Sequence, residues 1–202
     1  MSKAKRTKRY ITEKTAEIFN KKGFNGTSMS DITTATGLTK GSIYGNFKNK
    51  EEVAIAAFNY NYQNLIKRFT IHLTQENTAI GRLHAFLKTY EALYEDIIHI
   101  GGCPILNNAV DSDDTNTILN ALSSKAFYDW NKNLESIIKL GQSNGEVNND
   151  IEAGFYSSLF VSTIEGGLVL AKSTGEKKYF DHVIKHLKTT IKNSLSINSD
   201  LE

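Results

Sequence analysis

Hydrogen-bond donors, three lysines among them, cluster in a short stretch of the chain between Thr39 and Lys50. Hydroxyl, amide and ammonium groups contact phosphate oxygens and the edges of bases, and a glycine allows a helix to come close to its partner. Polar residues clustered at the start of a helix are typical of a helix that enters the major groove of DNA. The candidate contact residues in this stretch are Thr39, Lys40, Gly41, Ser42, Tyr44, Asn46, Lys48 and Lys50.

The residues before this stretch predict two helices that would hold it in place. Apolar positions recur at helical spacing from Thr7 to Lys22, and Gly23 then favours the end of that helix. Ser28 is suited to cap a second helix, in which Asp31 would place a carboxylate near the positive end of the helix dipole. This second helix is expected to be short and to end near Thr36.

A tight turn and a third helix are predicted to follow. Gly37 favours a left-handed turn, Leu38 is expected to point into the core, and Thr39 is suited to cap a helix from Lys40 to Phe47. Two helices joined by a short turn that contains glycine form a helix-turn-helix. The third helix has too few apolar residues for a core helix, which favours a binding role over a plain helical hairpin on the surface.

The charge of the chain is divided unevenly along its length. Residues 1–50 contain eleven lysines and arginines and three acidic residues, a net charge of +8, whereas the formal total for the chain is +2. The remaining residues therefore carry a net charge of −6. Because neutralisation of phosphates dominates the sequence-independent affinity for DNA, the asymmetry assigns attraction for a polyanion to the N-terminal part. A solvated basic tail is the other interpretation of the charge alone.

Length and composition favour an all-α protein with two domains. A chain of 202 residues exceeds the size typical of one domain, the only proline is Pro104, and alternating strand patterns of useful length are absent. We predict a three-helix head with the helix-turn-helix at residues 1–50 and a larger helical bundle at residues 51–202. Apolar spacing predicts its helices at about 53–69, 78–98, 105–110, 114–144, 151–174 with Asp150 as N-cap, and 180–195.

The segment from Gly23 to Lys50 resembles the DNA-binding part of the TetR family. It contains G-[FY]-x-x-T-[ST], then I-x-x-x-x-G-[VL], then K-G-[ST]-[IL]-Y-x-x-F-x-x-K at the separations usual in that family. The match covers roughly residues 7–58, about a quarter of the chain. Gly45 and Thr39 depart from the residues that are commoner in the family, which leaves the base preference at those contacts open.

The resemblance implies a regulator that binds double-stranded operator DNA as a homodimer and releases it when a small-molecule effector binds. By position, Ser30, Thr39, Lys40 and Ser42 would face DNA, and Tyr44 and Lys50 would hold phosphates. Ser28 is a further candidate DNA-binding residue. Ile32, Leu38 and Phe47 would form the small core of the head. The larger domain would then bind the effector and form the dimer. An activator, or a helical small-molecule binding protein whose head no longer reads DNA, is the alternative.

Aromatic and small residues mark two further candidate sites in the larger domain. Inward-facing apolar residues could line an effector pocket, although each one individually is more often part of a core. The candidates are Phe86, Tyr90, Tyr94, Leu106, Phe127, Trp130, Phe160 and Ile164. Relatives dimerise through their last two helices, where small residues permit close approach. A helix pair packed within one chain is the competing interpretation. The candidate interface residues are Gly166, Gly167, Val169, His182 and His186.

Other function classes find little support in the sequence. No nucleophile motif, P-loop or dinucleotide fingerprint occurs, so we expect no enzymatic activity and no cofactor. His182 and His186 lack a recognisable third ligand, and we predict no metal site. Cys103 is the only cysteine, so it cannot form an internal disulfide, and a redox role for it stays open. Without a signal peptide or a long apolar run, a cytoplasmic protein with no membrane contact is expected.

Overall fold

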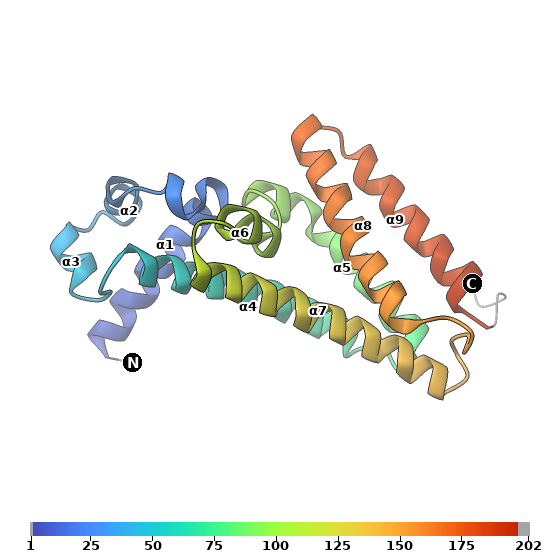
Figure 1. Cartoon of the computed structure of the whole chain (residues 1–202). Helices are drawn as coiled ribbons and strands as arrows, with labels where there is room; N and C mark the ends of the chain where they lie inside the picture. Colours follow the sequence, from blue (N-terminus) through green and yellow to red (C-terminus); the bar gives the residue numbers. More distant parts are fainter. Residues whose placement is uncertain (1, 198–202) are drawn as a thin grey trace. The chain divides into compact units, whose positions relative to one another are not determined.

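The structure, a computed structural model, describes residues 2–197, and most of these residues are helical. The β-type pairing within this range is one isolated bridge between Val147 and Ser196. The fold class is therefore all-α, as predicted. Figure 1 labels the helices α1 (Lys3–Gly26), α2 (Met29–Thr36), α3 (Lys40–Tyr44), α4 (Lys50–Leu73), α5 (Ala79–His99), α6 (Pro104–Ser112), α7 (Thr117–Ser143), α8 (Ala153–Thr174) and α9 (Lys178–Thr190), with a π-helical turn η1 (Ile191–Leu195) at the end.

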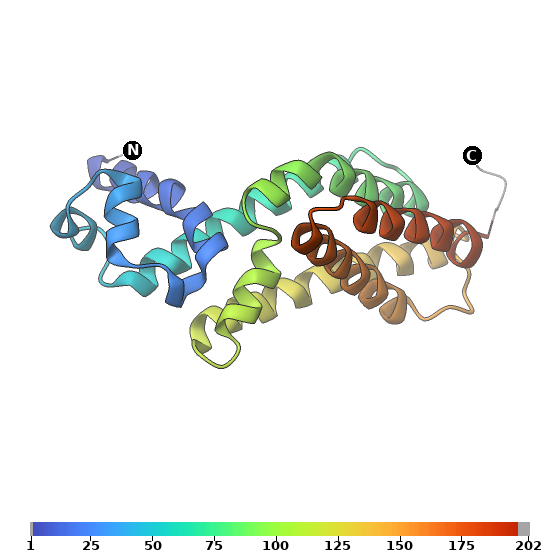
Figure 2. The same ribbon diagram turned by 90° about the horizontal axis from the view of Figure 1, so that it is seen from above.

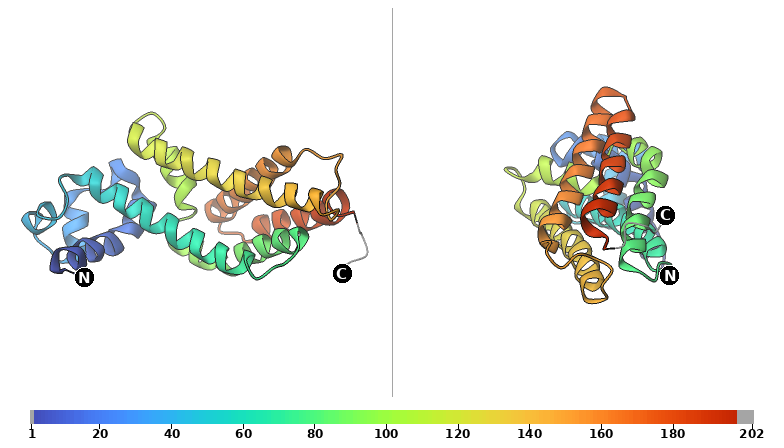
Figure 3. Two further views of the ribbon diagram at one scale, coloured as in Figure 1. Left: turned by 90° about the horizontal axis from the view of Figure 1, so that it is seen from below. Right: turned by 90° about the vertical axis from the view of Figure 1, so that its right-hand side faces the viewer.

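Packing divides the chain into two compact units. The head unit comprises the chain up to Leu65 together with His99–Lys125, and the body unit comprises Ile66–Ile98 and the chain from Ala126 onward. The helices α4 and α7 are continuous and each contributes residues to both units (Figure 3). This division differs from the predicted boundary at residue 50, because α6 packs on α1 and so joins the head.

The helices α1, α2 and α3 lie beside one another (Figure 2). They share a small apolar core, to which Ile11, Ile32 and Ile43 contribute one fully buried side chain from each helix. Phe47, which follows α3, is also buried, and Leu38 packs against the cluster while remaining partly exposed. The predicted core positions Ile32, Leu38 and Phe47 are confirmed. The third helix ends at Tyr44, three residues earlier than predicted, since Gly45 and Asn46 form a turn that brings Phe47 inward.

In the body unit, α5 buries one face along its length, and α8 and α9 pack side by side. The prediction for the start of α8 was wrong. Asp150 was expected to cap α8, but the helix begins at Ala153 after Glu152, and Glu152 makes no side-chain cap hydrogen bond. The physical reason is the loop before it, where Gln142 Nε2 donates to the carbonyls of Asn148 and Ile151 and holds those residues outside the helix.

The helix α8 is long and apolar enough, by length and composition, to cross a membrane. A core helix of a soluble protein passes the same test, and 44% of the most apolar window is buried against the rest of the chain. The buried side of α8 includes Phe160, Ile164 and Leu168, whereas Phe155 and Val169 are exposed. This helix therefore has one face in the body core and one apolar face that the described chain leaves uncovered.

Candidate DNA-binding site and effector cavity

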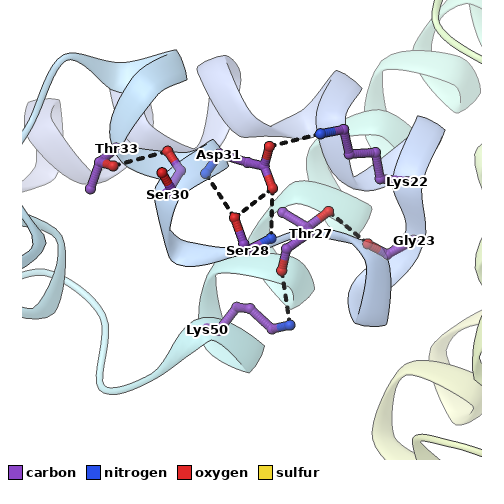
Figure 4. Close-up of polar contacts among 8 residues, drawn as sticks. All are labelled: Lys22, Gly23, Thr27, Ser28, Ser30, Asp31, Thr33 and Lys50. Carbon is purple, nitrogen blue, oxygen red and sulfur yellow. Dashed lines mark hydrogen bonds and ion pairs between the residues drawn. The ribbon is translucent and has the colours of Figure 1, made fainter.

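Ser28 and Asp31 fix the start of α2 through a reciprocal pair of hydrogen bonds (Figure 4). The Asp31 amide donates to Ser28 Oγ over 3.1 Å, and the Ser28 amide donates to Asp31 Oδ2 over 2.8 Å. Lys22 Nζ lies 2.7 Å from Asp31 Oδ1, and hydrogen bonds from Lys22 and Ser28 hold the pKa of the Asp31 carboxyl well below its usual range. The Ser28 hydroxyl also donates to Asp31 Oδ2, over 2.7 Å. Ser28 therefore positions the start of α2, and its hydroxyl proton is engaged within the head rather than offered to DNA.

Thr39 fixes the start of α3 in the same way. Gly37 has a φ of 67° and ends α2 in the left-handed conformation that only glycine adopts without strain. Thr39 Oγ1 then accepts a hydrogen bond from the Ser42 amide over 3.2 Å. Because the threonine oxygen acts as the acceptor in this cap, its hydroxyl proton remains available to donate to a phosphate. Both predicted caps of the helix-turn-helix are confirmed.

The outer side of α3 presents donors to solvent while its inner side is anchored. Ile43 is fully buried in the head core, whereas Lys40, Gly41 and Tyr44 are exposed. Tyr44 exposes 47% of its surface, which is unusual for a large aromatic residue and leaves its hydroxyl accessible. This arrangement fits a helix whose N-terminal turn and outer face meet DNA.

Gly41 leaves an open space on this surface. A Cβ placed on Gly41 would meet only Thr39 Oγ1, at 3.9 Å, and its backbone angles are those of an ordinary helix residue. Nothing in the folded chain therefore requires glycine at this position. A glycine in a helix lowers stability by roughly 0.5–1 kcal/mol relative to alanine, so its presence favours a role in close approach to an external partner.

Lys50 lies differently from the phosphate contact expected of it. Its ammonium donates to the carbonyl oxygens of Phe24 and Thr27 over 2.8 and 2.9 Å, and it lies 4.2 Å from the centre of the Phe24 ring. Figure 4 shows the Thr27 contact. Lys50 therefore holds the last turn of α1 and the start of the loop between α1 and α2. Lys48, whose side chain is 88% exposed, keeps its charge at the surface, and Asn46 Nδ2 donates back to the Ser42 carbonyl.

A group of polar residues in α6, which the sequence analysis did not identify as functional, ties α1 to α6 within the head unit. Phe24 N donates to Asp111 Oδ2 over 2.6 Å, and Gly23 has a φ of 70° beside it. A Cβ on Gly23 would overlap the Asp111 carboxylate. Asn107 Nδ2 donates to the Asn20 carbonyl over 3.1 Å. The sequence carries no local signal for these contacts, because the partners are separated by 87 residues.

The body unit contains a cavity of about 320 Å³ between α4, α5 and α7. Its floor is formed by Phe69, Phe86 and Trp130, which are buried, and Arg82 forms part of its wall. Ring centroids in the floor lie 5.3 Å apart for both Phe69–Phe86 and Phe69–Trp130. A volume of this size accommodates a small molecule.

Two of the eight predicted pocket residues, Phe86 and Trp130, line this cavity. The ring of Tyr90 packs on Phe69, with ring centroids 4.8 Å apart. The ring of Tyr94 packs on Phe180 of α9, also with ring centroids 4.8 Å apart. Others lie elsewhere in the core or at its edge: Phe160 and Ile164 are buried, Phe127 is half-buried, and Leu106 belongs to α6 in the head unit.

The candidate dimer residues divide into two groups. Gly166, Val169, His182 and His186 are exposed, and a Cβ on Gly166 would meet no atom within 4 Å. Gly167 is buried instead, and a Cβ there would lie 2.8 Å from Val183 Cγ2 on α9. Gly167 thus serves the crossing of α8 and α9 within one chain. Within residues 2–197, no group of three or more histidine, cysteine or acidic side chains is placed to hold a metal ion.

A helix-turn-helix with an exposed polar third helix, combined with a helical unit that contains a cavity, is typical of DNA-binding regulators. The comparisons agree. The pattern described as "Bacterial regulatory proteins, tetR family" matches residues 11–57, and the pattern described as "Tetracyclin repressor-like, C-terminal domain" matches residues 79–187, more than half of the chain. The chain belongs to the TetR family of transcriptional regulators.

Individual relatives extend this match over nearly the whole chain. A TetR-family regulator from Cytophaga hutchinsonii is 38% identical, with a TM-score of 0.90 and 98% of each chain covered. A TetR regulator from Chloroflexus aurantiacus J-10-FL is 33% identical, with a TM-score of 0.93, and the match covers 98% of this chain and all of that one. The HTH-type transcriptional repressor DhaR of Mycobacterium sp. (strain GP1) is 23% identical over 177 residues, 88% of each chain.

Proposed function

We propose that this regulator is a homodimeric repressor that inserts α3 of each head into the major groove of operator DNA and dissociates when an effector occupies the body cavity. The observation that carries the DNA-binding part is the outer surface of α3, where the exposed donors surround a glycine that the fold itself does not need. Similarity to the repressor DhaR supports repression rather than activation. We further propose that it acts in the cytoplasm without a catalytic step.

The route from effector to DNA is proposed to be α4. This helix runs without interruption from Lys50, which holds the α1–α2 loop, to Ile66, Phe69 and Thr70, which line the cavity. A ligand that displaces the second half of α4 therefore acts on a continuous helix whose first half belongs to the head unit. Coupling is reciprocal, so an effector that weakens operator binding tenfold must itself bind about tenfold more weakly to the DNA complex.

The DNA-binding part is tested by comparing Lys40→Ala with Lys50→Ala in mobility shifts on the DNA upstream of the protein's own gene. Lys40 is exposed on α3, so its loss is expected to weaken binding to every DNA sequence and to lower the salt slope by ~0.9 per phosphate contact, with an unchanged melting temperature. Lys50→Ala is expected to lower the melting temperature, because the Phe24 and Thr27 carbonyls lose their donor.

Two outcomes would contradict this division of roles. One is a Lys40→Ala protein that keeps both its affinity and its salt slope. The other is a Lys50→Ala protein that melts like the parent yet loses a phosphate contact. A reporter gene under the same upstream DNA separates repression from activation, since deletion of a repressor raises expression.

The proposed dimer is tested by a matched pair of substitutions on α8. Gly166→Leu adds a side chain to an exposed position where the chain itself leaves room, so the monomer should fold normally while a close helix crossing between subunits is overpacked by ~1–3 kcal/mol. Gly167→Leu should instead lower the melting temperature, because its side chain would collide with Val183. Sedimentation across a dilution series gives the readout. A Gly166→Leu dimer as tight as the parent would remove Gly166 from the interface.

A further inference from the structure

The wall of the body cavity contains a single charged residue, Arg82 on α5. The other lining residues are apolar or neutral, and the buried ones are aromatic or aliphatic. The cavity therefore has two chemically different parts. The apolar part favours an apolar body of a ligand, and the part beside Arg82 favours a group that accepts hydrogen bonds.

The guanidinium of Arg82 is only partly used by the protein. Its Nε donates to the Glu76 carbonyl oxygen over 3.1 Å, and no carboxylate of residues 2–197 lies within ion-pair distance of it. That single bond fixes the plane of the guanidinium while its two Nη groups stay open. An arginine held in this way is suited to bind a carboxylate through two parallel hydrogen bonds, which a neutral ligand cannot match in strength.

No acidic side chain of the described residues lines the cavity. Glu135 of α7 lies outside the lining and is paired with Lys132 over 2.8 Å and with Lys139 over 2.6 Å. The charge that the cavity wall presents is therefore the positive charge of Arg82, which favours an anionic ligand over a cationic one.

The hydroxyl groups at the rim offer little competition for the role of donor. Thr70, Thr74 and Ser136 each donate to the backbone carbonyl oxygen four residues earlier in the chain, at distances of 2.9, 2.8 and 2.7 Å. Their remaining lone pairs can only accept hydrogen bonds. Arg82 is thus the charged donor that faces the ligand, and the planar rings of the floor favour an aromatic body.

We propose that the cavity binds an aromatic carboxylate, with its ring against Phe69, Phe86 and Trp130 and its carboxylate on Arg82. This inference rests on the proposed function in one respect, namely that the cavity is the effector site. The class of ligand itself follows from the residues of the wall and can be measured without DNA.

The experiment titrates the full-length protein with matched acids and amides and follows the fluorescence of Trp130, the only tryptophan in the chain. The probes are benzoate and benzamide, 1-naphthoate and 1-naphthamide, and 4-biphenylcarboxylate and its amide, which cover a range of sizes. At least one acid is expected to bind about tenfold or more tightly than its amide. Arg82→Gln should abolish that preference by weakening the acid alone, and Arg82→Lys should retain part of it.

Arg68→Gln is the control variant, because it removes the same charge from the same unit. The Arg68 guanidinium is half exposed and pairs with Asp96 over 2.5 Å, outside the residues that line the cavity. It should keep the preference for the acid. The proposal is overturned if no acid in the series binds, if the amides bind as tightly as the acids, or if Arg82→Gln leaves the acid affinity unchanged.

Operator release is measured separately, so the two proposals fail in different ways. An acid that binds through Arg82 but leaves the operator complex intact would uphold the ligand class and reject the cavity as the effector site. Acids that do not bind at all, together with normal operator binding, would reject the ligand class while the DNA-binding function stands.

Discussion

Replacing Gly41 with leucine is expected to abolish operator binding while the head stays folded. The open space above Gly41 accommodates the side chain in the free protein, but the same space would be filled by DNA in the complex. Overpacking a close contact costs ~1–3 kcal/mol, and a dimer suffers it at both heads, so affinity should fall by at least about 30-fold. Mobility shifts give the affinity, and a thermal melt shows that the fold survives.

Gly41→Ala sharpens the test because stability and function should move in opposite directions. Alanine is expected to raise the free energy of unfolding by ~0.5–1 kcal/mol through its better helix propensity, and yet to weaken operator binding. Gly26→Ala is the matched control, since its Cβ would make an ordinary contact of 3.4 Å with Lys22 in the same unit. If the Gly41→Leu protein bound the operator as well as the parent does, α3 would not approach DNA through this surface.

Gly23→Ala is expected to have the largest effect on stability. Its backbone, at φ 70° and ψ 179°, lies in a region that is almost restricted to glycine, and occupancy by another residue costs ~1–3 kcal/mol. The added methyl group would also displace the Asp111 carboxylate and break its hydrogen bond from Phe24 N, at a further cost of ~1.5–3 kcal/mol. The sum is a large share of the ~5–15 kcal/mol that stabilises a typical protein.

A double-mutant cycle separates the two costs. Asp111→Ala alone loses the hydrogen bond but makes room at Gly23, so the steric part of the Gly23→Ala penalty should vanish in the double variant. The two substitutions together should therefore cost clearly less than the sum of the single ones, as measured by denaturant unfolding. Strictly additive costs would show that Asp111 and Gly23 do not interact, contrary to the geometry described.

The predictions that succeeded concern contacts between residues close together in the chain. The caps by Ser28 and Thr39 span three residues each, and Gly37 ends a helix through its own backbone. Local spacing is enough to identify such features. The role of Lys50 could not be found in this way, because its acceptors are Phe24 and Thr27, 26 and 23 residues away.

The predicted effector pocket shows a second limit of prediction from the sequence. Periodicity correctly placed Tyr90 and Phe160 on inward-facing sides, since both are buried, but it does not reveal where packing leaves a space. Phe86 and Trp130 line the cavity, whereas Tyr94 fills its position against Phe180. The sequence did not identify Arg82 as a cavity residue, because the sequence around a single arginine on a helix does not show whether its side chain faces solvent or a cavity.

The side-chain caps of α2 and α3 have a consequence for the thermodynamics of operator recognition. Both helices are closed by hydrogen bonds within the head, and the loop before them is held by Lys50, so the reading surface is already ordered in the free protein. Association then involves little ordering entropy, and its heat-capacity change reflects buried surface rather than coupled folding. If α3 binds DNA as proposed, we expect discrimination among DNA sequences to come from donors in fixed positions, because a mismatched base pair would meet a surface that is already ordered.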